Sequence, residues 1–341
     1  MKKFAGYEKG VSFGGWFSQC DYSKDRFDNF ITEKDFKKVS EWGLDHVRIP
    51  IDYNLVEDED GNYLDTGISY IQNAIDLCNK YSLNMILDVH KTLGFSFDNG
   101  ENEEGFFESE ELQEHFYKLW EMLTENFGKY HDSVAFELLN EVTDKAYCDK
   151  WNEISNTCIK RIRAICPDVY ILVGGYWNNS IESIKDIAMP YDDKIIYNFH
   201  CYEPLIFTHQ GAYWIPDMPS DLRTTYPNTI ENYKKDHAKI AKSSLSIYEF
   251  LKTENADVSL FEELFSEAIK IAEERDVALY CGEYGVINLA DTESTLKWYK
   301  DINSVFVKYG IGRAAWSFKE MDFGLDDEHM KPIIDEVVKY L

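Results

Sequence analysis

The sequence predicts an α/β fold, a (β/α)8 TIM barrel, with a small subdomain inserted after the sixth strand. Three observations lead to this prediction. Short β-rich runs alternate with longer amphipathic stretches, which is typical of parallel strands joined by helices. Eight such units in 341 residues favour one closed barrel over an open sheet. The alternation is interrupted only once, in the second half of the chain.

The candidate strands are short, and several are almost continuously apolar. Met-Ile-Leu-Asp-Val at 85–89 is one example, and a strand of that kind is covered on both of its faces. In chain order the candidate strands occupy residues 10–17, 46–51, 84–90, 134–140, 169–173, 195–200, 278–282 and 312–317. Their character therefore indicates a parallel sheet enclosed by helices.

The segments between the strands include helix-like stretches such as 32–42 and 68–81. In the second of these, Ile71, Ile75 and Cys78 repeat at helical spacing, which predicts a helix with one buried face.

The interruption begins after Tyr202 and contains four prolines, Pro204, Pro216, Pro219 and Pro227. We therefore expect one domain over residues 1–341, with an inserted loop or subdomain over residues 203–275. An insertion at this place in a barrel usually shapes the cleft.

The charge balance excludes some classes of partner. The chain has 62 acidic and 35 basic residues, a net charge of −27 at pH 7. A surface this acidic repels phosphate backbones and anionic lipid headgroups, so we expect no nucleic-acid and no membrane partner. A neutral ligand such as a carbohydrate feels little of this field. The same charge is also a plain solubility feature, and we expect a monomer.

The cysteines and the N-terminus indicate the compartment. Seven cysteines form no CxxC pair, which predicts free thiols in a reducing setting. The first residues, Met-Lys-Lys-Phe-Ala-Gly-Tyr-Glu, have no apolar region after the basic pair, and no run is long enough to span a bilayer. As written, the chain predicts a leaderless protein, either cytoplasmic or exported by a route that the sequence does not record.

Polar side chains follow the predicted strands at their carboxyl ends. In a barrel these ends meet at one mouth, so the side chains there converge. A buried polar group is costly unless it is paired, so this convergence needs a chemical reason. The strand ends deliver Arg48, His90, Asn140 with Glu141, His200 with Tyr202, Glu283 and Trp316.

Two glutamates in this set fit glycoside hydrolysis. A retaining mechanism needs two carboxyl groups about 5–5.5 Å apart, one ionised and one protonated. We assign Glu283 as the nucleophile because Arg48 is the strand-end cation able to keep it ionised, and Tyr202 offers a further hydrogen bond. Glu141 then becomes the acid/base, protonated because of the nearby charge and partial desolvation.

The remaining strand-end residues suit a sugar ligand. Asn140 is expected to hold the 2-hydroxyl, and His90 and His200 to bond the sugar or the carboxylates. Trp316 presents a flat apolar face for a pyranose ring. The histidines also fit as core residues, or as metal ligands together with Asp88. Because no HxH pair is present and two carboxyl groups suffice without metal, we expect no metal.

The other tryptophans are open to two interpretations. Trp16, Trp177 and Trp214 lie near the loops after strands one, five and six, where they are either sugar platforms or core residues. Four more lie in helix-like stretches and are expected in the core: Trp42, Trp120, Trp151 and Trp298. No glycine-rich phosphate loop follows any strand, so we expect no cofactor.

The strand-end motifs resemble those of glycoside hydrolase family 5, over nearly the whole chain. The motifs are Gly-Gly-Trp at 14–16, His-Val-Arg-Ile-Pro at 46–50, Leu-Asp-Val-His at 87–90, Leu-Leu-Asn-Glu at 138–141, Tyr-Asn-Phe-His-Cys-Tyr at 197–202, Tyr-Cys-Gly-Glu-Tyr-Gly-Val at 280–286 and Ala-Ala-Trp-Ser-Phe-Lys at 314–319. Within that family the chain looks most like short, leaderless bacterial endoglucanases with a subdomain after strand six.

The resemblance implies a function and a set of site residues. It places all eight of the family's active-site positions on residues of the expected types: Arg48, His90, Asn140, Glu141, His200, Tyr202, Glu283 and Trp316. It also implies a retaining endo-β-1,4-glucanase that acts on β-glucan polysaccharide or oligosaccharide, often of mixed linkage. A mannanase or xylanase on the same scaffold, and a non-catalytic carbohydrate-binding barrel, stay open as alternatives.

Overall fold

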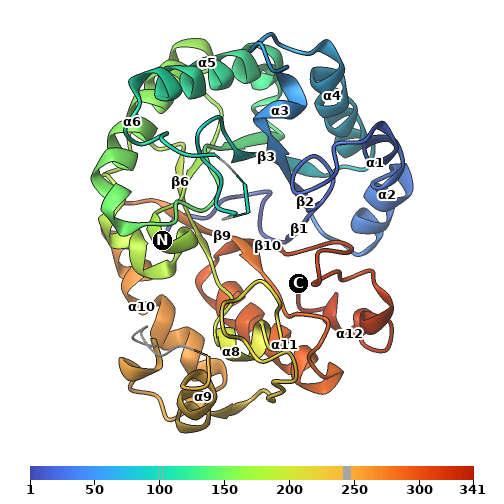
Figure 1. Cartoon of the computed structure of the whole chain (residues 1–341), viewed down its shortest axis with the longest axis vertical. Coiled ribbons are helices and arrows are strands. Elements are labelled where there is room, and N and C mark those ends of the chain that lie inside the picture. The colour runs from blue at the N-terminus through green and yellow to red at the C-terminus, as the bar shows by residue number, and fades with distance from the viewer. Residues whose placement is uncertain (99, 102, 241–246) are drawn as a thin grey trace.

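The structure, a computed structural model, describes residues 1–98, 100–101, 103–240 and 247–341 (Figure 1). It confirms the predicted barrel. Eight parallel strands close in the order β1-β10-β9-β6-β5-β4-β3-β2. The strands are β1 (Gly10–Ser12), β2 (His46–Asp52), β3 (Asn84–Lys91), β4 (Val134–Glu137), β5 (Ile171–Val173), β6 (Ile195–His200), β9 (Ala278–Tyr284) and β10 (Gly312–Ala315).

Helices surround the barrel in the order that the alternating pattern predicts. The long ones are α2 (Glu33–Glu41), α4 (Asp65–Lys80), α5 (Glu110–Phe127), α6 (Cys148–Ile165), α10 (Val258–Glu274) and α11 (Thr292–Tyr309). After β5 the corresponding place is taken by the short 3-10 helix η3 (Ile181–Asp186), which contacts β6 and α10. Shorter elements are α1 (Lys24–Asn29), α3 (Tyr53–Val56), α7 (Tyr176–Asn179), α12 (Ile334–Val337), η1 (Gly128–Tyr130), η2 (Lys145–Tyr147) and η5 (Glu328–Met330).

Local sequence explains where several helices begin and end. Ser109 accepts a hydrogen bond from the backbone N–H of Leu112 at the start of α5, and Asp291 does the same for Ser294 at the start of α11. At the end of α11, Gly310 adopts φ 69°, a left-handed conformation that glycine reaches without steric cost. These caps satisfy backbone groups that a helix end leaves open.

The interior of the barrel is mostly apolar at its amino-terminal end, where the buried His46 forms a hydrogen bond with the Tyr280 hydroxyl. Small and medium side chains from the strands pack together there, and Phe4 and Tyr7 of the N-terminal segment pack against them. The larger core lies between the strands and the helices and includes the fully buried Trp120 and Trp298, as the sequence predicts. The amino-terminal end is therefore filled, which leaves the carboxyl ends of the strands for a site.

Six strands differ from the prediction at their carboxyl ends, at the mouth of the barrel. The predicted strand 10–17 stops at Ser12, and β2 and β3 each run one residue further than predicted. The predicted strand 134–140 stops at Glu137, although Leu138 and Asn140 still donate backbone hydrogen bonds to Leu172 of β5 and Val89 of β3. The predicted strand 312–317 stops at Ala315, and the Trp316–Ser317 peptide bond is cis. Strand β9 extends to Tyr284, so Glu283 lies inside it.

The segment after β6 contains more than an insertion. Its last part is α10, which packs against α11 and η3 and so belongs to the helix layer of the barrel. The rest includes α8 (Leu205–Thr208), α9 (Ile230–His237), η4 (Ile247–Glu249) and a two-stranded antiparallel sheet of β7 (Asn228–Thr229) and β8 (Asn255–Ala256). Residues 241–246 of the predicted insertion lie outside the described residues. In Figure 1, α8 and α9 lie below the barrel, and α8 lies beside α11.

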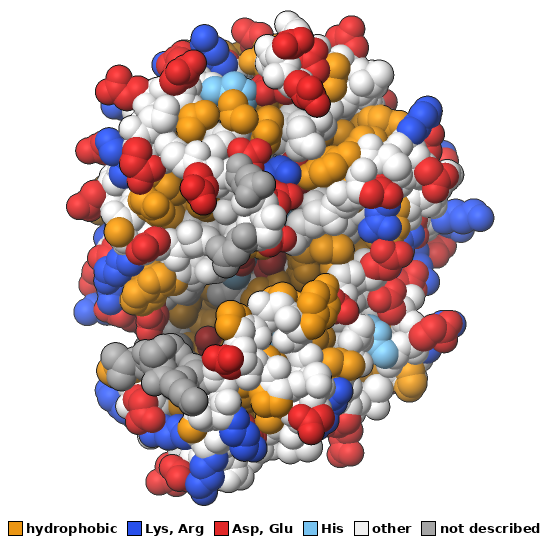
Figure 2. Space-filling view, in the orientation of Figure 1, with side chains coloured by type: hydrophobic (Ala, Val, Ile, Leu, Met, Phe, Trp, Pro, Cys, Tyr) orange, Lys and Arg blue, Asp and Glu red, His pale blue; other side chains and the backbone are white. Residues whose placement is uncertain are grey.

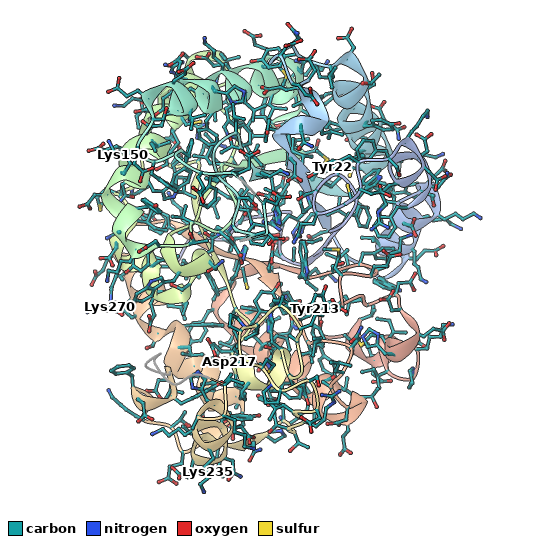
Figure 3. All side chains as sticks on the ribbon, viewed as in Figure 1. Tyr22, Lys150, Tyr213, Asp217, Lys235 and Lys270 are labelled. Atoms are coloured by element: carbon teal, nitrogen blue, oxygen red, sulfur yellow. The ribbon has the colours of Figure 1, made fainter. Side chains whose placement is uncertain are left out.

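The face of the molecule that carries these loops is hollowed. Figure 2 shows a groove that crosses it, with the segment after β6 below and the N-terminal part of the chain above. In Figure 3, Tyr22 lies above this groove and Tyr213 below it. No helix in the described ranges combines the length and the apolar character that crossing a membrane requires.

Candidate active site

The structure brings the eight strand-end residues of the sequence analysis to the mouth of the barrel. Arg48 comes from β2, His90 from β3, His200 from β6 and Glu283 from β9. Asn140 and Glu141 follow β4, Tyr202 follows β6 and Trp316 follows β10. Hydrogen bonds, ion pairs and one ring contact connect all eight.

Glu283 is held by two donors, one on each carboxylate oxygen. Nη1 of Arg48 lies 2.8 Å from Oε1, and the hydroxyl of Tyr202 donates to Oε2 at 2.8 Å. Burial and the neighbouring carboxylate raise the pKa of Tyr202 well above its usual value, so it stays a donor. A cation and a hydroxyl therefore face the two oxygens of the Glu283 carboxylate.

Arg48 is surrounded by two further carboxylates, Glu137, which the sequence analysis did not name, and Asp88, which it considered only as a possible metal ligand. Nε and Nη2 bind Glu137 at 2.7 and 2.9 Å, and Nη2 also lies 2.9 Å from Asp88. The side chains of Arg48, Glu137 and Asp88 are fully buried. The sequence could have pointed to both carboxylates. Each lies inside an apolar strand, where an unpaired charge is costly, so a charged partner could have been expected for each.

Glu141 has a different environment from Glu283. Its Oε1 lies 2.7 Å from Nδ1 of His200, and its Oε2 accepts a hydrogen bond from Asn178 at 2.9 Å. Burial raises the pKa of Glu141, while the Asn178 hydrogen bond lowers it to a smaller extent. Burial lowers the pKa of His200 to about 4, so this imidazole is neutral near pH 7. A carboxyl group whose pKa is raised by burial is suited to act as an acid/base.

Asn140 and His90 complete the polar part of the site. Oδ1 of Asn140 accepts a hydrogen bond from Arg48 at 2.9 Å, while its Nδ2 is buried without a partner among the described residues. Nδ1 of His90 lies 2.6 Å from Asp88, and the His90 ring stacks parallel to Trp316 with centroids 5.8 Å apart. An unsatisfied buried donor calls for a ligand or ordered water.

The four tryptophans proposed as sugar contacts occupy different places. Trp177 and Trp214 are 47% and 41% exposed, so each offers a ring to solvent. Trp316 is 6% exposed and lines the site beside His90. Trp16 is 2% exposed, its ring stacks on Phe17, and its indole N–H donates to the carbonyl of Phe27. The structure therefore places Trp16 in the core and not on the cleft surface.

Two geometric facts bear on the chemistry. An oxygen of Glu141, an oxygen of Glu283 and a ring nitrogen of His200 lie within 4.8 Å of one another. Within the described ranges this is the one such cluster of His, Cys, Asp or Glu, and it differs from the set of His90, His200 and Asp88 considered for a metal. The carboxylate atoms in it already have hydrogen-bond partners in His200, Asn178, Arg48 and Tyr202.

Asp88 provides a test of the buried charges. One arginine faces three carboxylates, and burial raises the pKa of Asp88 to about 7. In the unfolded chain the value is about 4. Between these values the folded protein holds a proton that the unfolded chain has released. Rising pH therefore lowers the stability of the folded state, by up to about 1.4 kcal/mol per pH unit.

We expect Asp88→Asn to remove this slope. Relative to the wild type, the variant should gain in free energy of unfolding as the pH rises from 5 to 8, measured by urea denaturation. His200 contributes a slope of opposite sign below about pH 6.5, which cancels in the comparison because both proteins contain it. Asp132→Asn, at a side chain that is 98% exposed, is the control. A difference that stays constant with pH would contradict the assignment of this proton to Asp88.

The chain is similar in sequence to known enzymes that act on glucose chains, judging by their names. The chain is 49% identical over 315 residues to cellodextrinase A of Ruminococcus flavefaciens, covering 92% of this chain and 86% of that protein. It is 38% identical over 346 residues to endoglucanase C of Acetivibrio thermocellus, covering 98% of each.

Solved structures agree on the fold. A hyperthermophilic endo-β-1,4-glucanase in complex with substrate superposes with a TM-score of 0.78 at 22% identity, over 98% of this chain and 96% of that one. A family model described as cellulase, glycosyl hydrolase family 5, matches residues 7–322. With the identities above, this match shows that the chain belongs to the cellulase family, glycosyl hydrolase family 5.

Proposed function

We propose that this glycoside hydrolase cleaves β-1,4-glucan chains with retention of configuration, with Glu283 as nucleophile and Glu141 as acid/base. One observation carries the proposal. The two carboxylates approach within 4.8 Å, close to the spacing of about 5–5.5 Å in retaining enzymes and far below the roughly 6.5–9.5 Å of inverting ones. The spacing leaves no room for a water molecule between nucleophile and sugar.

In the first step Glu283 attacks the anomeric carbon. Arg48 and Tyr202 each bind one oxygen of this carboxylate and so hold it in place for the attack. Glu141 gives its proton to the oxygen of the leaving sugar, and its raised pKa keeps that proton available near neutral pH. A covalent glycosyl-enzyme and a shortened chain result.

In the second step Glu141 acts as a base. Esterification removes the charge of Glu283, so Arg48 is left with Glu137 and Asp88. Glu141, now ionised, takes a proton from water as the water oxygen attacks the anomeric carbon. Glu283 leaves as a carboxylate, and the product has the β configuration of the substrate.

The remaining residues bind the sugar in this proposal. Nδ2 of Asn140, which has no partner among the described residues, would donate to the 2-hydroxyl. Trp316 would stack on the ring at the reacting centre, and the exposed Trp177 and Trp214 would contact sugars further along the cleft. The names cellodextrinase and endoglucanase of the relatives support glucose chains over mannan or xylan.

A panel of substrates tests this function. We expect release of reducing ends from barley β-glucan, carboxymethylcellulose and cello-oligosaccharides, and much less from glucomannan and xylan. Proton NMR of the first products should show the β-anomer before mutarotation. The rate with EDTA should equal the rate without it, because the two carboxyl groups act unaided.

Three outcomes would contradict it. Faster release from mannan or xylan would assign another sugar to the same machinery. An α-anomer as first product would remove the retaining mechanism. Tight binding of cello-oligosaccharides without any product would indicate a carbohydrate-binding barrel.

The compartment and the oligomeric state are part of the proposal. All seven cysteines are free thiols, and five of them are buried, which suits a reducing compartment in which short imported chains are the substrate. We propose a monomer. Light scattering coupled to gel filtration measures its mass directly.

A further inference from the structure

The segment after β5 makes an unusual turn. Trp177, Asn178 and Asn179 adopt φ values of 51°, 57° and 54°, three left-handed residues in succession and none of them glycine. Asparagine tolerates this conformation better than most residues, but a bulky residue such as tryptophan is a true outlier there. Backbone in such a conformation persists only where the surroundings hold it, and it clusters at functional sites.

The surroundings do hold this turn. The backbone N–H of Asn178 donates to the carbonyl of Val142, just after Glu141, at 3.0 Å. Asn179 is fully buried. The hydroxyl of Tyr176 bonds Asp186 in η3. The turn is therefore tied on one side to the residue after the acid/base and on the other to the helix layer.

The turn places two amides against the acid/base assembly. Nδ2 of Asn178 donates to Oε2 of Glu141 at 2.9 Å. Nδ2 of Asn179 lies 3.4 Å from Nε2 of His200, whose Nδ1 lies 2.7 Å from Oε1 of Glu141. An extended or right-handed backbone at these positions would point the two side chains elsewhere.

The second amide sets the tautomer of His200. Asn179 presents an N–H, so Nε2 of the neutral imidazole accepts and the ring proton resides on Nδ1. Nδ1–H then donates to Oε1 of Glu141, and that oxygen is occupied by a donor. His200 is buried and covers Oε1, whereas the hydrogen bond between Oε2 and Asn178 lies on the exposed side. Oε2 is therefore the oxygen from which the proton reaches the leaving sugar, and its second lone pair accepts the hydrogen bond from Asn178.

We propose that the turn 177–179 is a positioning device for the acid/base, in which Asn178 orients the proton-bearing Oε2 of Glu141 and Asn179 fixes His200 on Oε1. The inference rests on the proposed function of Glu141. Asn178 favours the ionised carboxylate, so it makes Glu141 a stronger acid at the moment when the leaving oxygen needs its proton.

Other titratable or charged groups also face Glu141 and influence its pKa. They come from several strands: Arg48, Asp88, His90, His200, Tyr202 and Glu283. Lys145 packs over the ring of Trp177 in the turn itself. Replacing Asn178 leaves all of these groups in place, so a change in the pH profile reports the amide alone.

The experiment compares Asn178→Gly with the wild type. Glycine removes the amide and accepts the left-handed backbone, so the variant should fold. We expect the alkaline limb of the pH profile of kcat/KM to shift to higher pH by roughly half to one unit. The reason is that the ionised form of Glu141 loses a hydrogen bond, which raises the pKa of Glu141. We expect kcat/KM for cellotetraose to fall by about 10-fold, and that for 2,4-dinitrophenyl β-cellobioside by less than about 2-fold, because that leaving group needs no proton.

Two further variants complete the test. Asn178→Asp keeps the shape and the left-handed preference but replaces the donor by a carboxylate, which should move the alkaline limb further up. Ser82→Gly relieves a left-handed residue with φ 57° before β3 and should leave the pH profile unchanged.

An unchanged alkaline limb in Asn178→Gly, or equal losses on both substrates, would mark the turn as merely structural and overturn the inference. If Glu141→Ala kept the wild-type rate on cellotetraose, the proposed function itself would be overturned.

Discussion

Replacing Glu283 by alanine is expected to lower kcat on cello-oligosaccharides by on the order of 10⁵-fold. The side chain makes the bond to the anomeric carbon, and no other carboxylate in the described part of the chain is placed to substitute for it. Glu137 and Asp88 are bound to Arg48 in the interior. The variant should still fold, because Glu283 lies at the edge of the buried network and its loss reduces the excess of negative charge. Stopped assays with the purified variant measure the residual rate.

Azide separates the two glutamates by the stereochemistry of the product. In Glu283→Ala, azide enters the space of the lost carboxylate and displaces the leaving group once, which gives an α-glycosyl azide. In Glu141→Ala, a dinitrophenyl cellobioside still forms the glycosyl-enzyme, and azide then attacks where water would, which gives the β product. Proton NMR distinguishes the anomers. The opposite pairing of variant and anomer would reverse the assignment of roles, and absence of rescue in both would argue against a retaining mechanism.

The second large effect concerns Arg48. Its fully buried guanidinium binds Glu137 through Nε and Nη2. Nη1 binds Glu283, and Nη2 also lies against Asp88. Lysine carries one compact charge and cannot make this fork. Arg48→Lys should therefore lose about 3–5 kcal/mol of stability, because buried carboxylates are left without a partner. We expect kcat to fall by roughly 10³-fold as well, since Glu283 loses its orientation.

Two comparisons make this measurable. Adding Glu137→Gln removes one of the stranded charges, so the double variant Arg48→Lys with Glu137→Gln should recover part of the stability that the single variant lost. Arg163 binds Asp192 through two nitrogens, and the Asp192 side chain is 28% exposed. Arg163→Lys therefore leaves a carboxylate that water still reaches, and it should cost less stability than Arg48→Lys. Urea unfolding of the four proteins tests both. Similar losses at Arg48 and Arg163, or no recovery in the double variant, would contradict the role of Arg48 as the partner of several buried charges.

The fold was predictable because it depends on a repeated pattern. Eight apolar runs separated by amphipathic stretches specify buried parallel strands and a helix layer wherever they occur. Two helix positions differ from the pattern in the described chain: η3 replaces a long helix after β5, and after β10 the chain forms the four-residue α12. The end of the insertion was also missed, because α10 is as amphipathic as any barrel helix and the sequence carries no signal for where the extra segment stops.

The site was predictable to the extent that it sits on strand ends. Arg48, Glu141 and Glu283 stand out as charged residues beside apolar runs, and barrel geometry brings such positions together. Burial of tryptophans follows no comparable rule. Trp16 and Trp177 look alike in sequence, yet Trp16 is 2% exposed and Trp177 47%. The difference comes from the neighbours, since Phe17 and Phe27 enclose Trp16 while a left-handed turn carries Trp177 outward.

Residue types and their periodicity were enough to predict the barrel, the convergence of eight polar and aromatic side chains at its mouth, and the chemistry those side chains suit. The pairing of these side chains follows from the folded arrangement. It placed Glu137 and Asp88 on Arg48, and it brought Asn178 to Oε2 of Glu141 through a left-handed turn. Residue types and periodicity predict which side chains face inward. The partner of each buried charge depends on distances of a few ångströms between segments far apart in the chain, and only the folded arrangement sets those distances.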